Sequence, residues 1–192
     1  SAPWGSALLL PITYGYIKML GGDGLRRATE MAIVNANYMS SALAAEYRTY
    51  YSGETGRVGH EMILDLTNFK HDGDIAHRLM DYGFHAPTLS FPVHETLMVE
   101  PTESEPKAEM DRFMEALVHI KRECEAAAGQ EDNVVRNAPH TAVEIAGEWS
   151  HPYSRREAAF PLGWIAEAKF WPYVSKIDNG YGDRNLVCRC TE

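Results

Sequence analysis

The chain has 192 residues, a formal net charge of −9 and only three cysteines. Nucleic acid is not an expected partner, because a phosphate-binding surface needs clustered Lys and Arg and the sequence has no such cluster. A membrane is not expected either, because no apolar stretch approaches the roughly 18 residues needed to span a bilayer. Three unevenly spaced cysteines do not make a disulfide framework, which favours a reducing compartment.

Residues 1–50 predict a leading segment followed by a long helix. Residues 21–24 read Gly-Gly-Asp-Gly, which favours a break in the helix. From Leu25 to Tyr47 apolar residues recur every three to four positions, which predicts a helix with one apolar face. The first residue is not Met, so we expect the chain to begin inside a longer polypeptide. The segment is therefore interpreted as leading from a further, missing domain.

Residues 51–128 predict a small α+β domain. After a glycine-containing loop, apolar and polar positions alternate over residues 60–67, which predicts a half-buried strand. A helix then ends at Gly83, because glycine adopts the left-handed conformation that closes a helix at little steric cost. Pro87 and Pro92 keep the following chain extended.

The second half of this domain predicts a strand that leads into a helix. Residues 96–100 are β-branched and apolar, which favours a buried strand. Ser104 is the expected N-cap of a helix over residues 105–128, because its hydroxyl can accept a hydrogen bond from a backbone N–H of the first turn. Cys124 lies at helical spacing behind the apolar residues of this helix and is interpreted as a small buried hydrophobe.

Residues 129–192 predict an ordered extension across another surface. Four closely spaced prolines exclude long elements, yet a disordered tail would be poor in aromatic residues. The aromatic residues expected to be buried there, on this domain or on a part not present here, are Trp149, Tyr153, Phe160, Trp164, Phe170, Trp171, Tyr173 and Tyr181. Cys188 and Cys190 form a C-x-C that could be an exposed redox pair. No metal site is expected, because no second Cys or His pair completes a tetrahedral set.

Two loops hold the candidate site residues. His85 and Thr88 follow the helix stop, where prolines restrict the backbone, although His85 could also be a satisfied interior histidine. In the second loop Arg136 offers a planar cation suited to a carboxylate or phosphate, and Asn137 lies beside it. His140 carries an imidazole that can move a proton. The alternative is that Arg136 pairs with an acidic residue such as Glu131 and that His140 only bonds local backbone.

Five stretches, in the same order, resemble the glycine decarboxylase family, the P-proteins of the glycine cleavage system. They are SAPWGSA at 1–7, DYGFHAPT at 81–88, EPTES at 100–104, RNAPHT at 136–141 and YGDRNLVC at 181–188. The resemblance runs from Ser1 to Cys190. It implies an α+β fold: the C-terminal small domain of an aspartate-aminotransferase-like (fold type I) pyridoxal-phosphate enzyme. The long linker helix, a small antiparallel sheet with helices and the aromatic-rich tail would be its parts.

The resemblance also implies an activity. In this family glycine is decarboxylated on pyridoxal 5'-phosphate, and the aminomethyl group passes to the lipoyl group of the H-protein. The expected partners are glycine, the lipoyl H-protein, the missing large domain and a second copy in a dimer. The compartment would be the cytoplasm in a bacterium or the mitochondrial matrix in a eukaryote. The residues expected to take part are His140, Arg136, Asn137 and His85 in catalysis and Thr88 in cofactor binding.

The cofactor-binding lysine of the family is missing from this sequence. In the family it lies in a His-Lys motif followed by glycines, upstream of the SAPW stretch. The lysines present have no glycine-rich phosphate cradle beside them; they are Lys18, Lys70, Lys107, Lys121, Lys169 and Lys176. The fragment alone is therefore expected to be inactive, and the cofactor is expected to be bound mainly by the missing upstream domain.

Two other functions remain open from the residues. The chain could be a stand-alone, non-catalytic α+β binding or regulatory module, which the absence of the lysine favours and the ordered motifs disfavour. It could also be the small domain of another pyridoxal-phosphate enzyme, such as an aminotransferase, which the RNAPHT and DRNLVC stretches disfavour. The sequence that precedes Ser1 would discriminate, because the enzyme needs a lysine followed by a glycine-rich run there.

Overall fold

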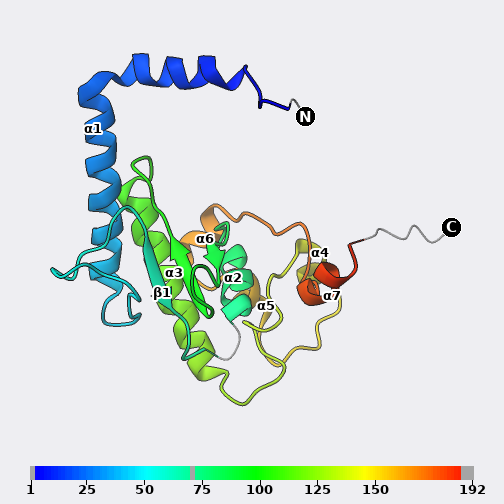
Figure 1. Ribbon diagram of the computed structural model, residues 1–192. Coiled ribbons are helices and arrows are strands. Elements are labelled where there is room, and N and C mark those ends of the chain that lie inside the picture. Colours follow the sequence, from blue (N-terminus) through cyan, green and yellow to red (C-terminus); the bar gives the residue numbers. More distant parts are fainter. Residues whose placement is uncertain (1–2, 70–71, 187–192) are drawn as a thin grey trace. The chain divides into compact units, whose positions relative to one another are not determined.

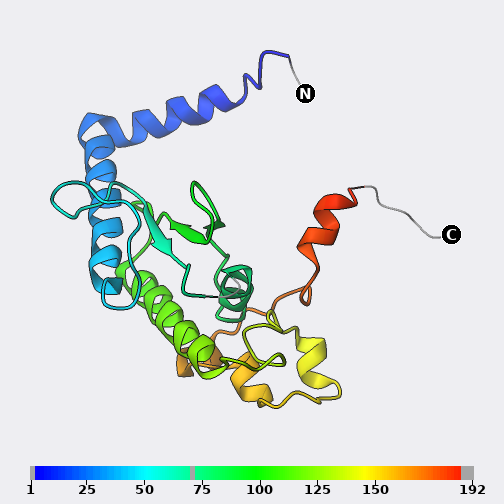
Figure 2. The ribbon, with the colours of Figure 1, turned by 60° about the horizontal axis from the view of Figure 1, so that its bottom comes forward.

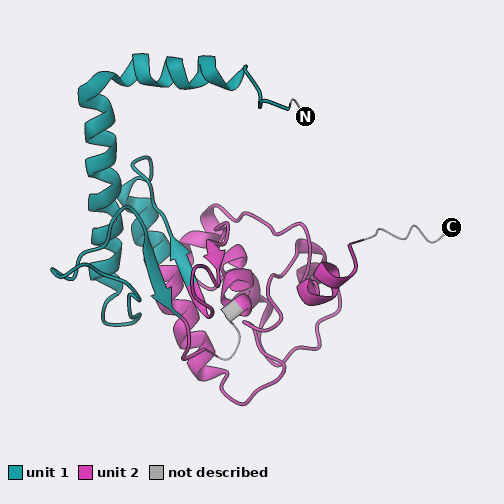
Figure 3. Cartoon of the chain, in the orientation of Figure 1, with its two compact units in different colours: residues 1–65, 97–114 teal, residues 66–96, 115–192 magenta. Residues whose placement is uncertain are grey.

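A computed structural model describes residues 3–69 and 72–186, and within them the chain forms two compact units (Figure 3). Unit 1 comprises residues 1–65 and 97–114, and unit 2 comprises residues 66–96 and 115–192. Helices and short strands both contribute, so the predicted α+β class is confirmed. None of the helices in the described ranges combines the length and the apolar character needed to cross a membrane.

Unit 1 begins with the helix α1 (Leu9–Leu43), which is kinked at Gly21 (Figure 1). The predicted break at residues 21–24 is confirmed at Gly21, but a further helical segment, which was not predicted, precedes it from Leu9. Gly21 alone leaves helical geometry, at φ 62° and ψ −176°. Glycine reaches this conformation at little cost, so the chain turns and the helix resumes at once. The helix also ends earlier than predicted, and Tyr47 lies buried beyond its end.

The two halves of α1 differ in burial. In the C-terminal half Ala36, Met39 and Leu43 are buried, which confirms the predicted apolar face there. Asn35 Nδ2 donates a hydrogen bond to the carbonyl oxygen of Thr102 at 2.9 Å and ties this half to the rest of unit 1. The N-terminal half exposes large apolar side chains instead, among them Leu9, Leu10, Ile12, Ile17 and Met19.

A three-stranded sheet joins β1 (Met62–Asp65), β2 (Thr88–Leu89) and β3 (Thr96–Val99) in the order β1-β3-β2. Neighbouring strands run antiparallel, as predicted. The strand predicted over residues 60–67 is confirmed, but its half-buried pattern is wrong. Met62, Ile63 and Leu64 are all buried, because Ile63 is itself apolar and lies where the alternation placed solvent.

Unit 2 contains α2 (Asp72–Asp81), which ends as predicted at Gly83. Gly83 has a φ of 85°. Its N–H donates to the carbonyl of Met80 at 3.0 Å, and the N–H of Phe84 donates to the carbonyl of Leu79 at 3.1 Å. These two bonds satisfy the last carbonyls of the helix, which is the usual role of a left-handed residue at this position.

The helix predicted from residue 105 is α3 (Lys107–Ala126). The prediction of Ser104 as its N-cap is wrong, because the carbonyl of Pro106 accepts the first bonds, from Glu109 and Met110. The hydroxyl of Ser104 pairs with that of Thr102 at 2.8 Å instead. The predicted apolar face is confirmed by the buried residues Met110, Phe113, Met114, Leu117 and Ile120. Cys124 on the same helix is half-buried, and mainly this burial raises the pKa of its thiol to about 12.

The C-terminal part of unit 2 carries short helices separated by irregular stretches (Figures 1 and 2). They are α4 (Ala142–Ala146), α5 (Arg155–Ala159), α6 (Gly163–Glu167) and α7 (Asn179–Arg184). Aromatic contacts order this part, as between Phe160 and Trp171, whose ring centroids lie 5.8 Å apart. Phe170, Tyr173 and Tyr181 are exposed. The C-x-C of Cys188 and Cys190 lies outside the described residues.

Candidate functional site

A fully buried arginine organises the polar interior of unit 2. Arg78 on α2 has no exposed surface, and each of its N–H groups meets an acceptor. Nε and Nη2 donate to the two carboxylate oxygens of Glu123 on α3, at 2.9 and 2.7 Å. Nη1 donates to Asp81 Oδ2 and to the carbonyl of Ala158, both at 2.8 Å, and Nη2 donates to the carbonyl of Glu157 at 2.7 Å. The side chain therefore fastens α5 to α2 and α3.

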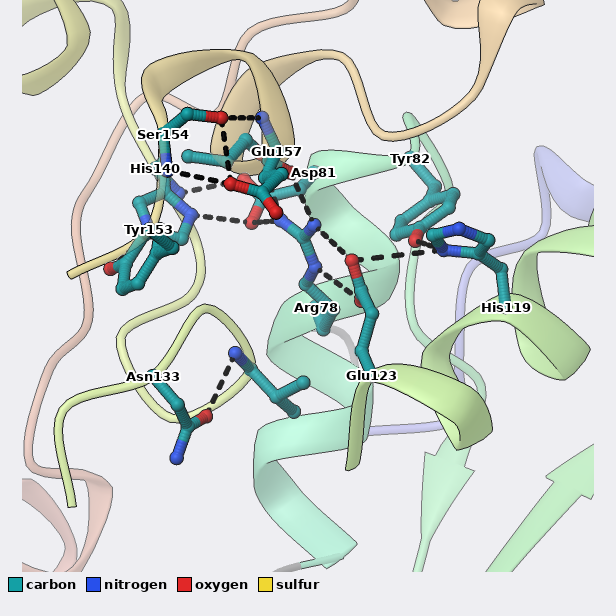
Figure 4. Close-up of polar contacts among 12 residues, drawn as sticks. Arg78, Asp81, Tyr82, His119, Glu123, Asn133, His140, Tyr153, Ser154 and Glu157 are labelled. Carbon is teal, nitrogen blue, oxygen red and sulfur yellow. Dashed lines mark hydrogen bonds and ion pairs between the residues drawn. The ribbon is translucent and has the colours of Figure 1, made fainter. Parts of the chain in front are cut away.

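Asp81 links this arginine to His140 in the second predicted loop (Figure 4). Asp81 Oδ1 accepts the backbone N–H of His140 at 2.7 Å, and Oδ2 lies 2.8 Å from His140 Nδ1. Asp81 has no exposed side-chain surface and His140 is 3% exposed. Burial of charged side chains is tolerated only where they are paired and hydrogen-bonded, as they are here.

Beyond His140 the contacts continue to Tyr153. His140 Nε2 lies 3.0 Å from the Tyr153 hydroxyl, which also accepts a hydrogen bond from Asn137 Nδ2 at 2.9 Å. The Tyr153 ring stacks on His151, with centroids 5.0 Å apart and planes 15° from parallel. Asn137 also donates to Asp132 Oδ1 at 2.6 Å. The two predicted residues Asn137 and His140 thus meet at one hydroxyl.

Local capping holds the loop that carries these residues. Asn133 Oδ1 accepts the backbone N–H groups of Val135 and Arg136 at 3.1 and 2.9 Å. Immediately after His140, Thr141 and Glu144 form a reciprocal capping box that begins α4. Such caps satisfy backbone donors that would otherwise be left unpaired, so the loop has a fixed backbone on both sides of His140.

The electrostatics of the cluster follow from burial and pairing. Burial alone would lower the pKa of Arg78, but the hydrogen bonds and charges of Glu123 and the charge of Asp81 raise that pKa above its ordinary value. Burial raises the pKa of Tyr153 to about 12, so its hydroxyl stays protonated at neutral pH. Burial also lowers the pKa of Lys169 to about 8, and the Lys169 amine donates a hydrogen bond to the carbonyl of Asp81.

Tyr153 borders an open cleft in unit 2 of about 490 Å³. Charged and aromatic side chains line it, among them His119, Glu123, Arg156 and Phe160. The carboxylate of Glu123 is already bound to Arg78, and His119 Nδ1 lies 2.6 Å from the Tyr82 hydroxyl. The lining of the cleft includes neither His140 nor Asn137, the partners of the Tyr153 hydroxyl.

The remaining predicted residues lie elsewhere. Arg136 Nη1 pairs with Glu131 Oε2 at 2.9 Å on the surface, which is the structural alternative considered for it. His85 is exposed, with Nδ1 3.0 Å from the carbonyl of Ala86, and Thr88 is exposed in β2. Arg78, Asp81 and Tyr153 were not among the residues predicted for the site. A buried Arg–Asp pair at i,i+3 looks in sequence like the solvated face of a helix, so only the DYGFHAPT and RNAPHT stretches gave a signal nearby.

These features define a small α+β domain with a polar cluster buried in its C-terminal part. The sequence model described as "Glycine dehydrogenase, C-terminal domain" matches residues 28–140, more than half of the chain. The chain belongs to this family. It is 59% identical to a protein of Flavobacterium johnsoniae, 57% to one of Akkermansia muciniphila and 55% to one of Christiangramia forsetii, each named "Glycine dehydrogenase (decarboxylating)". Each match covers 99% of this chain but only 21% of the relative, so the chain spans about a fifth of their length.

Proposed function

We propose that the chain is the C-terminal part of a glycine dehydrogenase (decarboxylating). Identity of 55–59% along nearly the whole chain to three proteins of that name is the observation that carries the proposal. The complete enzyme would decarboxylate glycine on pyridoxal 5'-phosphate and transfer the aminomethyl group to the lipoyl H-protein. It would have the aspartate-aminotransferase-like fold type I, act as a dimer, and work in the cytoplasm of a bacterium or the matrix of a mitochondrion.

The activity belongs, on this proposal, to the complete protein. In the proposed division residues 1–50 lead from the large domain, residues 51–128 form the small domain and residues 129–192 wrap as an extension. The exposed apolar side chains of the N-terminal half of α1 support this, because a monomer rarely exposes a large contiguous apolar patch without covering it in an assembly. The large domain is the proposed cover, and the fragment alone would be inactive.

The described residues do not form a pyridoxal-phosphate site by themselves. A Schiff-base lysine needs a free amine beside a phosphate cradle, but Lys169 donates to the Asp81 carbonyl, Lys107 pairs with Asp111 and Lys176 pairs with Asp74. Lys121 lies 4.0 Å from Glu125, and Lys18 lies over the Tyr14 ring. We therefore propose that the upstream domain supplies most of the cofactor site.

The proposed contribution of this chain is the loop at residues 136–141 together with His85 and Thr88, which would border the active site of the complete enzyme. His140 and Asn137 are held rigidly by Asp81, Tyr153 and the flanking caps. A fixed backbone and fixed side chains are what a site needs to orient a substrate and exclude water. Arg136 would have to leave Glu131 to bind a carboxylate.

The experiment is a hybrid enzyme in which this chain replaces the corresponding C-terminal segment of the Flavobacterium johnsoniae relative. The hybrid is expected to exchange the carboxyl group of glycine with bicarbonate in the presence of lipoyl H-protein. Arg136→Lys and His140→Asn in the hybrid test the loop. If melting falls while exchange per folded molecule is unchanged, the loop is structural and these residues are not part of the site.

A further inference from the structure

Residues 169–177, named here the outer strip, lead from α6 to α7 without forming a helix or strand (Figure 1). We propose that the outer strip is a preordered docking surface for the upstream part of the complete polypeptide. This rests on the proposed function, because the occupant is the part of a glycine dehydrogenase that this chain does not span.

One set of side chains fastens the first half of the outer strip to the rest of unit 2. Lys169 donates a hydrogen bond to the carbonyl of Asp81, and its Nζ lies 5.1 Å from the centroid of the Trp171 ring. Trp171 in turn packs edge-on against Phe160, at 5.8 Å between centroids. Pro172 is buried. The backbone of this half is therefore held by a hydrogen bond to α2 and by aromatic packing.

The second half of the outer strip is anchored as well. Lys176 Nζ bonds to Asp74 Oδ1 at 2.6 Å and to the carbonyl of Arg136. Ser175 hydrogen-bonds to the carboxylate of Glu144 on α4. The strip is thus ordered before any partner binds, which removes part of the conformational entropy loss that binding would otherwise cost.

The other set of side chains in the outer strip is exposed, large and apolar. Its members are Phe170, Tyr173, Val174 and Ile177, with exposed fractions of 58–89%. The rings of Phe170 and Tyr173 contact each other edge-on, with centroids 6.0 Å apart. Both lysines of the strip are used in its anchoring, so the exposed face of residues 169–177 carries no charged side chain. A contiguous apolar face of this kind marks an interaction site.

The size of this face favours an occupant in the same polypeptide. The exposed set offers on the order of 500 Å², given that one large aromatic side chain can bury about 150–250 Å². A separate partner, a second copy of the chain included, needs about 800 Å² on each side for a stable interface. A covalently linked partner needs less, because linkage makes the contact intramolecular and raises its effective concentration. The chain spans about a fifth of the length of its relatives, so the remaining four-fifths can supply the cover.

The first test reads exposure directly, by hydroxyl-radical footprinting with mass spectrometry. In the 192-residue chain Tyr173, at 89% exposed, is expected to be oxidised much faster than Tyr82, which is 2% exposed and serves as the buried reference. In the hybrid enzyme the oxidation of Tyr173 should fall several-fold, to near the rate of Tyr82. Equal oxidation of Tyr173 in the two proteins overturns the proposal. Oxidation that falls in the 192-residue chain as its concentration rises assigns the strip to a second copy and overturns it too.

The second test compares one double variant, Tyr173→Ser with Val174→Ser, in the two proteins. Both side chains are exposed in the 192-residue chain, so its urea midpoint should stay unchanged. The same variant should lower the melting temperature of the hybrid, because there it removes apolar surface that is buried. An unchanged melting temperature overturns the docking.

Both readouts are independent of glycine–bicarbonate exchange, so the two proposals can fail separately. A folded hybrid that protects Tyr173 but does not exchange overturns the proposed function alone. A hybrid that exchanges while Tyr173 is oxidised as fast as in the 192-residue chain overturns the docking alone.

Discussion

Replacing Arg78 with alanine is expected to destabilise the chain by about 3–5 kcal/mol, the range found when one partner of a buried ion pair is removed. Arg78 makes hydrogen bonds to two carboxylates and two backbone carbonyls, and it has no exposed surface. Its removal leaves Asp81 and Glu123 without their cation. Each hydrogen bond to a charged group contributes about 1.5–3 kcal/mol when measured alone. The expected destabilisation is smaller than the sum of these values, because contributions of groups in one network are not additive.

Arg78→Lys separates charge from geometry. A lysine keeps the positive charge but offers three donors, whereas the arginine satisfies five contacts with a planar fork. We expect this variant to lose about 1–3 kcal/mol, the cost of a buried acceptor left unpaired. It therefore lies between alanine and the wild type.

Urea unfolding followed by tryptophan fluorescence measures both variants, because Trp149, Trp164 and Trp171 all lie in unit 2. The control is Arg26→Ala, which breaks an exposed i,i+4 pair with Glu30 and should cost no more than about 0.5 kcal/mol. An Arg78→Ala protein within about 1 kcal/mol of the wild type would refute the reasoning, because buried charges left unpaired cost more than that.

Three further outcomes are expected. Gly83→Ala should destabilise the chain by about 1–2 kcal/mol, because Gly83 has a φ of 85°. The control Gly73→Ala on α2, where φ is not positive, should not destabilise it. Equal urea midpoints of the two variants would contradict this expectation. Borohydride reduction of the chain with pyridoxal phosphate should give no stoichiometric adduct, since the Lys169 amine is bound to Asp81; one fully modified lysine, lost in Lys169→Arg, would count against it. Cys124, with a pKa of about 12, should react with iodoacetamide at pH 8 at least about a hundredfold more slowly in the folded chain than in urea. Peptide mapping measures the two rates, and equal rates would contradict this expectation.

Periodicity predicted the longer elements α1, β1 and α3, because it reports how a single element buries one face, but it did not predict the short helices α4 to α7. The apolar spacing of Met110, Leu117 and Ile120 identified α3, and the conformational freedom of Gly83 identified the end of α2. At Gly21 the predicted break is confirmed, but the helical segment that precedes it, from Leu9, was not predicted. Sequence shows that a glycine can turn, but the flanking contacts decide whether the helix resumes.

The candidate site was accessible only in part. His140 and Asn137 stood out because a proline-restricted loop placed them between two regions of different character. The other residues of the cluster did not stand out, because its contacting pairs are far apart in the sequence. Asp81 lies 59 residues before His140, and Glu123 lies 45 residues after Arg78. A charged residue that finds its counter-ion through tertiary packing has the same local pattern as one in solvent.

Exchange of glycine with bicarbonate by the hybrid enzyme tests the central claim most directly. The hybrid combines this chain with the remaining four-fifths of the Flavobacterium johnsoniae relative, and the same relative truncated before this segment is the control. We expect exchange by the folded hybrid with lipoyl H-protein and none by the truncated protein. A hybrid that folds and assembles like the relative but does not exchange would contradict the assignment of this chain to a glycine dehydrogenase.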